Sequence, residues 1–282
     1  MARLKLVLAA LLFSSGSVVI KAADSLDAWQ IACGRNAVAA AFLALLARKA
    51  VPLRGRVGLV AAAYALTSIC FVNANRLTTA VRAVFLQGTS PLWVLLFSPL
   101  LLGERLRRRE LWFLAAVALG LYLLVTGPQA ATATASNPEL GNILGAGAGL
   151  GWGFTVIGLR WLSTRQPGSP WAGASIILGN ALAMLVTLPM ALQGPTPTAG
   201  GIAAILFLGV FQIGLAYRLV LSALAEVPAL EATLILLLEP VLSPVWAALA
   251  LGEIPSMRAV VGGSVILGAT LWNARQKTRR MA

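Results

Sequence analysis

The sequence is dominated by long apolar runs separated by short connectors, and this pattern restricts the chain to very few folds. A helix that crosses a bilayer needs about 17–25 mostly apolar residues. Runs of this kind occupy residues 4–22, 28–48, 57–75, 78–101, 110–126, 139–161, 170–192, 199–217, 228–251 and 256–274. Because lipid cannot hydrogen-bond exposed backbone groups, each run is predicted to be a helix. The chain is therefore predicted to be an all-α polytopic membrane protein with ten transmembrane helices.

Composition argues against a water-soluble fold. Hydrophobic residues make up 59% of the 282 residues and charged residues only 11%, whereas about a quarter of the residues in soluble domains are charged. The net charge of +13 does not indicate nucleic-acid binding, because the basic residues form short clusters between apolar runs. The sequence has no histidine, and Cys33 and Cys70 lie within apolar runs. We therefore expect no disulfide framework, no metal site and no cofactor.

The distribution of positive charge sets the predicted orientation. With ten spans and a cytoplasmic N-terminus, most of the 22 Lys and Arg residues fall on the cytoplasmic side. The exceptions are Lys21, Arg76, Arg82 and Arg258 outside, and Arg35 within a helix. One helix more or fewer would destroy this positive-inside bias. We predict a multi-pass protein of the inner (plasma) membrane with both termini cytoplasmic, and we interpret residues 4–22 as a span rather than a signal peptide.

An internal repeat divides the chain into two segments, residues 1–137 and 138–282. Residues 85–104 resemble residues 234–253 at an offset of 149 positions, so that Pro91 aligns with Pro240 and each segment ends in Leu-Gly-Glu. Each segment holds five predicted spans. Because five is an odd number, the second copy must enter the membrane in the opposite direction, which gives an inverted repeat.

These motifs resemble a known group of transporters. The Pro…Gly-Glu ends of the fourth and ninth runs, the sequence Leu238-Glu239-Pro240-Val241 and Arg35 in the second run are similar to the EamA-type family of the drug/metabolite transporter superfamily, which includes bacterial exporters of amino acids, notably aromatic ones. The resemblance implies a 5+5 inverted repeat around a central cavity and alternating access. It further implies a secondary transporter that exports small metabolites, above all amino acids. Export of drugs or other metabolites, and a channel or scaffold without active transport, remain alternatives.

The motifs in the sequence argue against an enzyme and indicate which partners to expect. The Asp24–Asp27 pair has the spacing of a diphosphate-metal motif, but Asp27 is better interpreted as the N-cap of the next helix. Metalloprotease, phosphate-loop and nucleophile–base motifs are lacking, so an enzyme is not expected. The expected partners are a small-molecule substrate and lipid, without nucleic acid and with a monomer as the simplest assembly. Proton coupling stays open. Four-helix members of the superfamily use an acid in their first helix, and the first run here has no acidic residue.

Glu239 is the most informative single residue, because it is an acid in the middle of an apolar run. An ionisable group at the centre of a bilayer is costly and usually marks a transport pathway. Glu239 is predicted to contact a substrate amine or to act as a protonatable coupling group. The structural alternative is that it satisfies backbone freed by Pro240, and both interpretations are kept.

Other polar and aromatic residues near the predicted midplane form the rest of the candidate site. Gln87 and Ser90 share a face beside the helix-kinking Pro91, and they line a cavity or bridge neighbouring helices. Trp152, within a glycine-rich run, is too deep for the interfacial belt and is predicted to face the cavity or to pack. The remaining predicted substrate-binding residues are Trp93, Gln212, Tyr64 and Ser14.

The predicted topology can be tested by labelling single introduced cysteines with an impermeant thiol reagent, in a background without Cys33 and Cys70. Cysteines near residues 130 and 195 should react from outside intact cells. Cysteines in the C-terminal tail should react only after the membrane is opened. Labelling of all three positions from one side contradicts the ten-helix arrangement.

Overall fold

The computed structural model describes residues 1–47, 54–103, 108–126, 135–165 and 167–252, together with ten residues between 257 and 272. This described part of the chain is helical and contains no β-strand. The helices of the first half are α1 (Ala2–Ser14), α2 (Gly16–Ala22), α3 (Ala28–Leu46), α4 (Gly55–Leu77), α5 (Ala80–Gln87), α6 (Ser90–Leu102) and α7 (Arg108–Val125). Those of the second half are α8 (Pro138–Arg165), α9 (Trp171–Ala191), α10 (Ala199–Phe207), the π-helix η1 (Leu208–Leu215), α11 (Ala216–Leu224), α12 (Ala229–Leu236) and α13 (Leu238–Leu251).

Several helices are long and apolar enough to cross a membrane. Within the described residues there are 8, and they correspond to the first four predicted runs and to the sixth through ninth. The fifth run is α7, whose apolar part, Leu111–Leu123, is shorter than a usual span. Most of the tenth run, 256–274, lies outside the described residues. The eighth run was expected to end at Tyr217 before Arg218, and that boundary is wrong, because α11 continues to Leu224.

Two of the spans are broken at equivalent positions. The α5 and α12 pieces are each 8 residues long, and each is followed by a break and a second piece, α6 or α13. Both second pieces end at a left-handed glycine, Gly103 at φ 69° and Gly252 at φ 67°. Pro91 and Pro240 lie in the first turns of these pieces. Backbone N–H groups in a first turn have no acceptor within the helix, so proline, which lacks the N–H, costs no hydrogen bond there. Each proline therefore lies just after a break in its span, and its role as the cause of a kink stays a prediction.

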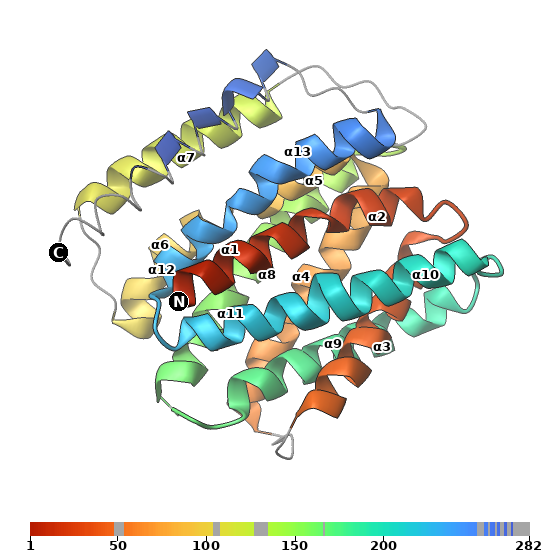
Figure 1. Cartoon of the computed structure of the whole chain (residues 1–282), viewed down its shortest axis with the longest axis horizontal. Helices are drawn as coiled ribbons and strands as arrows, with labels where there is room; N and C mark the ends of the chain where they lie inside the picture. The colour runs from red at the N-terminus through yellow and green to blue at the C-terminus, as the bar shows by residue number, and fades with distance from the viewer. Residues whose placement is uncertain are drawn as a thin grey trace.

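The broken spans cross each other at the centre of the bundle. The first piece of each packs on the second piece of the other, α5 on α13 and α12 on α6. The helix α1 packs against α11, α12 and α13, whereas α8 packs against α4, α5 and α6. Figure 1 shows α1 in the middle of the bundle, between α11 and α13. Both breaks are thus enclosed by neighbouring helices rather than exposed to lipid.

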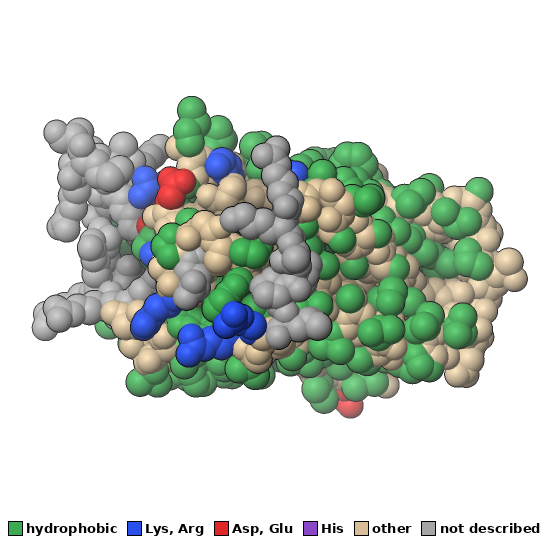
Figure 2. All heavy atoms as spheres, turned by 90° about the horizontal axis from the view of Figure 1, so that it is seen from below, with side chains coloured by type: hydrophobic (Ala, Val, Ile, Leu, Met, Phe, Trp, Pro, Cys, Tyr) green, Lys and Arg blue, Asp and Glu red, His purple; other side chains and the backbone are tan. Residues whose placement is uncertain are grey.

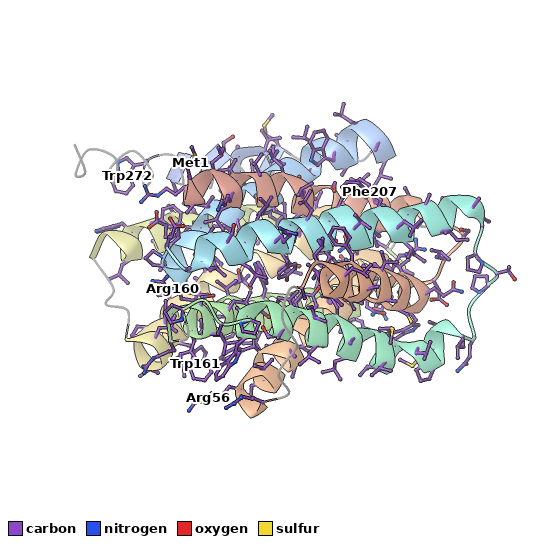
Figure 3. All side chains as sticks on the ribbon, turned by 60° about the horizontal axis from the view of Figure 1, so that its bottom comes forward. Met1, Arg56, Arg160, Trp161, Phe207 and Trp272 are labelled. Carbon is purple, nitrogen blue, oxygen red and sulfur yellow. The ribbon has the colours of Figure 1, made fainter. Side chains whose placement is uncertain are left out.

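Contacts between helix ends define the two ends of the bundle. At the Met1 end, Arg3 Nε lies 2.8 Å from Glu231 Oε1, and Arg160 Nη1 donates to the Leu224 carbonyl at 2.7 Å. Figure 3 shows Arg56, Arg160 and Trp161 towards this end, with Phe207 in the other half of the molecule.

Three further contacts join helix termini at the opposite end. Arg76 donates to the carbonyl of Ala23 at 3.0 Å, Gln30 Nε2 donates to Pro195 O at 2.7 Å, and Arg258 donates to Thr126 O at 2.8 Å. Asp27 caps α3 as predicted, in a capping box with Gln30. Successive spans therefore alternate in direction between the two ends.

The outer surface is apolar. Leu45, Leu59, Leu100 and Leu249 are each at least 73% exposed, and Figure 2 shows hydrophobic side chains along most of the visible face, with most of the visible Lys and Arg side chains towards the end at which Met1 lies. A surface with so much contiguous apolar area is unsuited to water and matches a lipid environment.

A row of glycines in α8 allows close helix contact. A Cβ added at Gly145 would lie 2.9 Å from Leu86, one at Gly149 would lie 2.6 Å from the Leu86 carbonyl oxygen, and one at Gly153 would lie 2.8 Å from Trp93. These residues are four apart, so they form one face of the helix. The spacing of these glycines therefore lets α8 pack closely against the broken fourth span.

Replacing Gly149 should separate α8 from the broken fourth span. We expect Gly149→Ala to lower the thermal unfolding temperature of the detergent-solubilised protein, because the new methyl group meets a backbone oxygen. Gly147→Ala is the matched control, since its nearest neighbour is Cys70 Sγ at an ordinary 3.6 Å. Equal unfolding temperatures for the two variants would show that the close contact at Gly149 does not affect stability.

Candidate functional site

A small cavity lies where the two broken spans cross. Its volume of 40 Å³ accommodates a few water molecules and is far below the roughly 300–1,000 Å³ of ordinary ligand pockets. Its lining comes from both halves of the chain. The residues are Phe13, Arg35, Tyr64, Thr67, Ser68, Phe71, Gln87, Trp152, Gln212, Ile213, Tyr217 and Glu239.

Glu239 enters the cavity from the break between α12 and α13. It lies in the first turn of α13, where free N–H groups and the helix dipole favour a negative charge. Its side chain is 4% exposed. Within the described part of the chain, no hydrogen bond or ion pair engages its carboxyl group. The carboxyl group is thus buried and free to bind a ligand.

Gln87 occupies the corresponding break of the other span. It is the last residue of α5, it is 9% exposed, and it lines the cavity opposite α13. Ser90, which aligns with Glu239, is buried at the start of α6 but is outside the cavity lining. The two breaks therefore contribute different chemistry, an amide from the first and an acid from the second.

Gln212 reaches the cavity from the π-helix η1. Single π-turns within α-helices are rare and occur frequently at functional sites. Gly16, at the break between α1 and α2, provides the space, because a Cβ there would lie 2.8 Å from Gln212 Nε2. Gln212 Oε1 is buried and accepts no hydrogen bond from the described residues. It is therefore a second unused polar atom in the lining.

Four aromatic side chains form a cluster on one side of the cavity. Phe13, Trp152 and Tyr64 each contact the ring of Tyr217 edge-on, with centroids 5.4, 5.8 and 5.1 Å away. Tyr64 is held in turn by its hydroxyl, which donates to Asn180 Oδ1 at 2.9 Å. This geometry is the favourable one for aromatic pairs.

The aromatic cluster lies towards the Met1 end of the cavity. Tyr217 follows Gln212 by five residues, or about 7 Å along the helix, and this helix runs on to Leu224 at the Met1 end. Tyr217 thus lies between Gln212 and that end.

Three predicted site residues lie outside the lining. Ser14 Oγ donates to Leu11 O at 2.7 Å and accepts the Trp246 indole N–H at 2.9 Å. Trp93 is half-buried against Gly153, and Ser90 is buried in the helix break. The other five, Tyr64, Gln87, Trp152, Gln212 and Glu239, meet in the cavity.

Phe13, Phe71 and Tyr217 line the cavity although they were not among the predicted site residues, and Arg35 had no predicted partner. Phe13 and Phe71 carry no signal that distinguishes them from other apolar residues in their spans. Tyr217 is the last residue of the predicted run 199–217, whereas η1 and α11 form one continuous span. Arg35 stood out as a charge within a span, and only the fold brings it into the same cavity as Glu239.

Comparison with known proteins identifies relatives over the whole chain. The model of the EamA-like transporter family matches residues 1–126 and 139–275. An uncharacterized protein of Pseudomonas aeruginosa is 32% identical over 289 residues, which cover 96% of each chain. The pseudopaline exporter CntI of the same species is 34% identical over 128 residues, which cover 42% of this chain and 44% of that protein.

The fold recurs in a solved structure. A protein crystal structure superimposes with a TM-score of 0.74, covering 100% of this chain and 99% of that one at 21% sequence identity. At this identity the likeness concerns the fold alone.

Removing the ring of Tyr217 should weaken the centre of the bundle. We expect Tyr217→Ala to cost roughly 3 kcal/mol or more of stability, the scale of aromatic deletions in packed cores, and to lower the unfolding temperature in detergent. Tyr122→Ala removes the same ring from a residue that is 64% exposed and should leave that temperature nearly unchanged. Similar losses in both variants would show that the cluster is not a packing centre.

Proposed function

This chain belongs to the EamA-like transporter family, and we propose that it exports small metabolites, above all amino acids, from the cytoplasm across the inner membrane. A membrane transporter, rather than an enzyme, is what the family and the relative named as an exporter support. The substrate class, the direction and the membrane are our proposals.

We further propose that the transporter is an inverted repeat of five helices in each of the segments 1–137 and 138–282. Two observations support this arrangement. The family model matches the chain in two successive parts, and the broken spans have equal first pieces and equivalent glycine ends. Repeats of this kind form a site at their interface that opens alternately to the two sides.

The proposed orientation puts the Met1 end in the cytoplasm. Figure 2 shows most of the basic side chains on the visible face gathered towards that end, as the positive-inside rule requires. Substrate would then enter from the side on which the aromatic cluster lies.

The observation that carries the proposal is the buried, unpaired carboxyl group of Glu239 in a small cavity between the two halves. An ionised carboxylate at this depth is costly unless it serves a ligand or a coupling ion. A scaffold has no need of such a group. The anionic carboxylate suits a substrate amine, and its protonation would instead couple export to protons.

Transport by this site requires the cavity to widen. A volume of 40 Å³ leaves no room for an amino acid. We propose that the aromatic cluster parts when the site opens to the Met1 end and re-forms when the site opens to the other end. Because the rings belong to α1, α4, α8 and α11, a small shift of one half against the other would separate them.

The aromatic and apolar part of the lining also suits a second class of substrate. Drugs and other metabolites with a cationic group and an apolar body would contact Glu239 and the same rings. Such compounds therefore belong in any substrate panel.

Reconstituted liposomes loaded with single amino acids test the proposal. At least one should leave faster than from protein-free vesicles, and Glu239→Gln and Trp152→Ala should each reduce the rate without abolishing folding. Glu139→Gln and Trp112→Ala change the same residue types at exposed positions and should transport normally. If no amino acid moves above the protein-free rate, the amino-acid assignment fails, and unaltered rates in the two site variants would remove these residues from the site.

A further inference from the structure

Arg35 is a buried cation with unused hydrogen-bond donors. It lies in the span α3 and is 3% exposed. Its Nη2 donates to Ser68 Oγ at 2.8 Å and to Ser68 O at 3.3 Å. The other two nitrogens of the guanidinium group, Nε and Nη1, are buried without a hydrogen-bond partner in the described part of the chain. Two of its three nitrogens are therefore available to a ligand.

The side chain of Arg35 is held in a fixed position. Ser68 Oγ donates onward to Asn36 Oδ1 at 3.0 Å, and Asn36 Nδ2 donates to Ala32 O at 2.6 Å. The guanidinium carbon lies 5.8 Å from the centre of the Phe71 ring. These contacts fix the position of the Arg35 guanidinium group before a ligand arrives. A ligand that binds its other donors therefore costs little additional side-chain entropy.

An unpaired guanidinium group in this position needs an anion. Arginine stays protonated in proteins, and a buried charge without a partner costs several kcal/mol. Glu239 lines the same cavity, but the two residues form no ion pair in the described structure. The cavity is therefore lined by a cation from α3 and an acid from α13 that form no salt bridge with each other in the described structure.

We propose that the cavity is a two-ended site for zwitterions, in which Arg35 binds the carboxylate of the substrate and Glu239 binds its protonated amine. This inference rests on the proposed function and narrows its substrate class to compounds that carry both groups, such as α-amino acids. The substrate then joins the two halves of the chain through its own charges. Its side chain faces the aromatic cluster of Phe13, Tyr64, Trp152 and Tyr217.

A charge at each end explains selectivity as well as affinity. A compound with only an amine leaves Arg35 unpaired, and a compound with only a carboxylate leaves Glu239 unpaired. Both compounds should bind more weakly, because leaving a buried polar group unpaired costs more free energy than a hydrogen bond to it contributes. We expect each one-charge analogue to bind roughly tenfold or more weakly than the zwitterion, from the usual strength of a charged hydrogen bond.

Ligand-induced thermal stabilisation of the purified full-length protein tests the inference independently of transport. The probes are L-phenylalanine and L-leucine, with 2-phenylethylamine and 3-methylbutylamine as the amines and 3-phenylpropanoate and 4-methylpentanoate as the acids. The wild type should be stabilised by an amino acid at concentrations at least about tenfold lower than by its analogues. Arg35→Gln should lose this preference over the amine while still responding to the amine.

Three further variants separate binding from folding. Arg35→Lys keeps the charge and should retain part of the preference, and Ser68→Ala, which frees the positioned edge of Arg35, should weaken it. Arg258→Gln removes an exposed arginine that bonds Thr126 O and should behave as wild type. A folding defect would weaken amino acid and amine together, whereas loss of a carboxylate contact changes their ratio.

The outcomes distinguish the two proposals. If the amine stabilises the wild type as well as the amino acid does, if Arg35→Gln keeps the wild-type ratio, or if no zwitterion binds, the two-ended site is wrong, whether or not transport occurs. If amino acids bind with the expected ratio and yet none is transported in liposomes, the two-ended site stands and the proposed export function falls.

Discussion

Backbone hydrogen bonding in lipid is the constraint on which the structure depends. An unpaired N–H or C=O is too costly in hydrocarbon, yet the two equivalent spans of the two halves break in mid-course, between α5 and α6 and between α12 and α13. Such breaks are tolerated only inside protein. The reciprocal crossing of the broken spans and the glycine face of α8 enclose both of them. The cavity is the space that this enclosure leaves.

The same enclosure makes the charges of the cavity informative. Glu239 and Arg35 are both buried within spans, where solvent cannot screen or solvate them. In a soluble protein the two would be a modest surface feature, whereas here each unpaired charge costs enough to require a ligand, a proton or an alternative conformation. We therefore propose that substrate binding and conformational change are linked through these two groups.

Sequence reasoning succeeded where local physics decides the outcome and failed where packing does. The Asp27 cap follows from the chemistry of a single residue, and the structure has it. Trp93 and Ser14 satisfy the same midplane criterion as Gln87, but their helices turn them towards Gly153 and Trp246 instead. The rotation of a helix about its axis is set by the helices that pack against it. Because the lipid-facing and the packed sides of a span are both apolar, its sequence contains little information about that rotation.

By itself the sequence determined the solvent, the helical class and most of the spans, because hydropathy and length act locally along the chain. Only the tertiary structure decided which polar groups meet. Arg35 and Glu239 are about two hundred residues apart in the chain, and Tyr217 joins three other rings from distant helices. Their encounter depends on how helices from the two halves cross, and that geometry is a property of the packed bundle rather than of any one span.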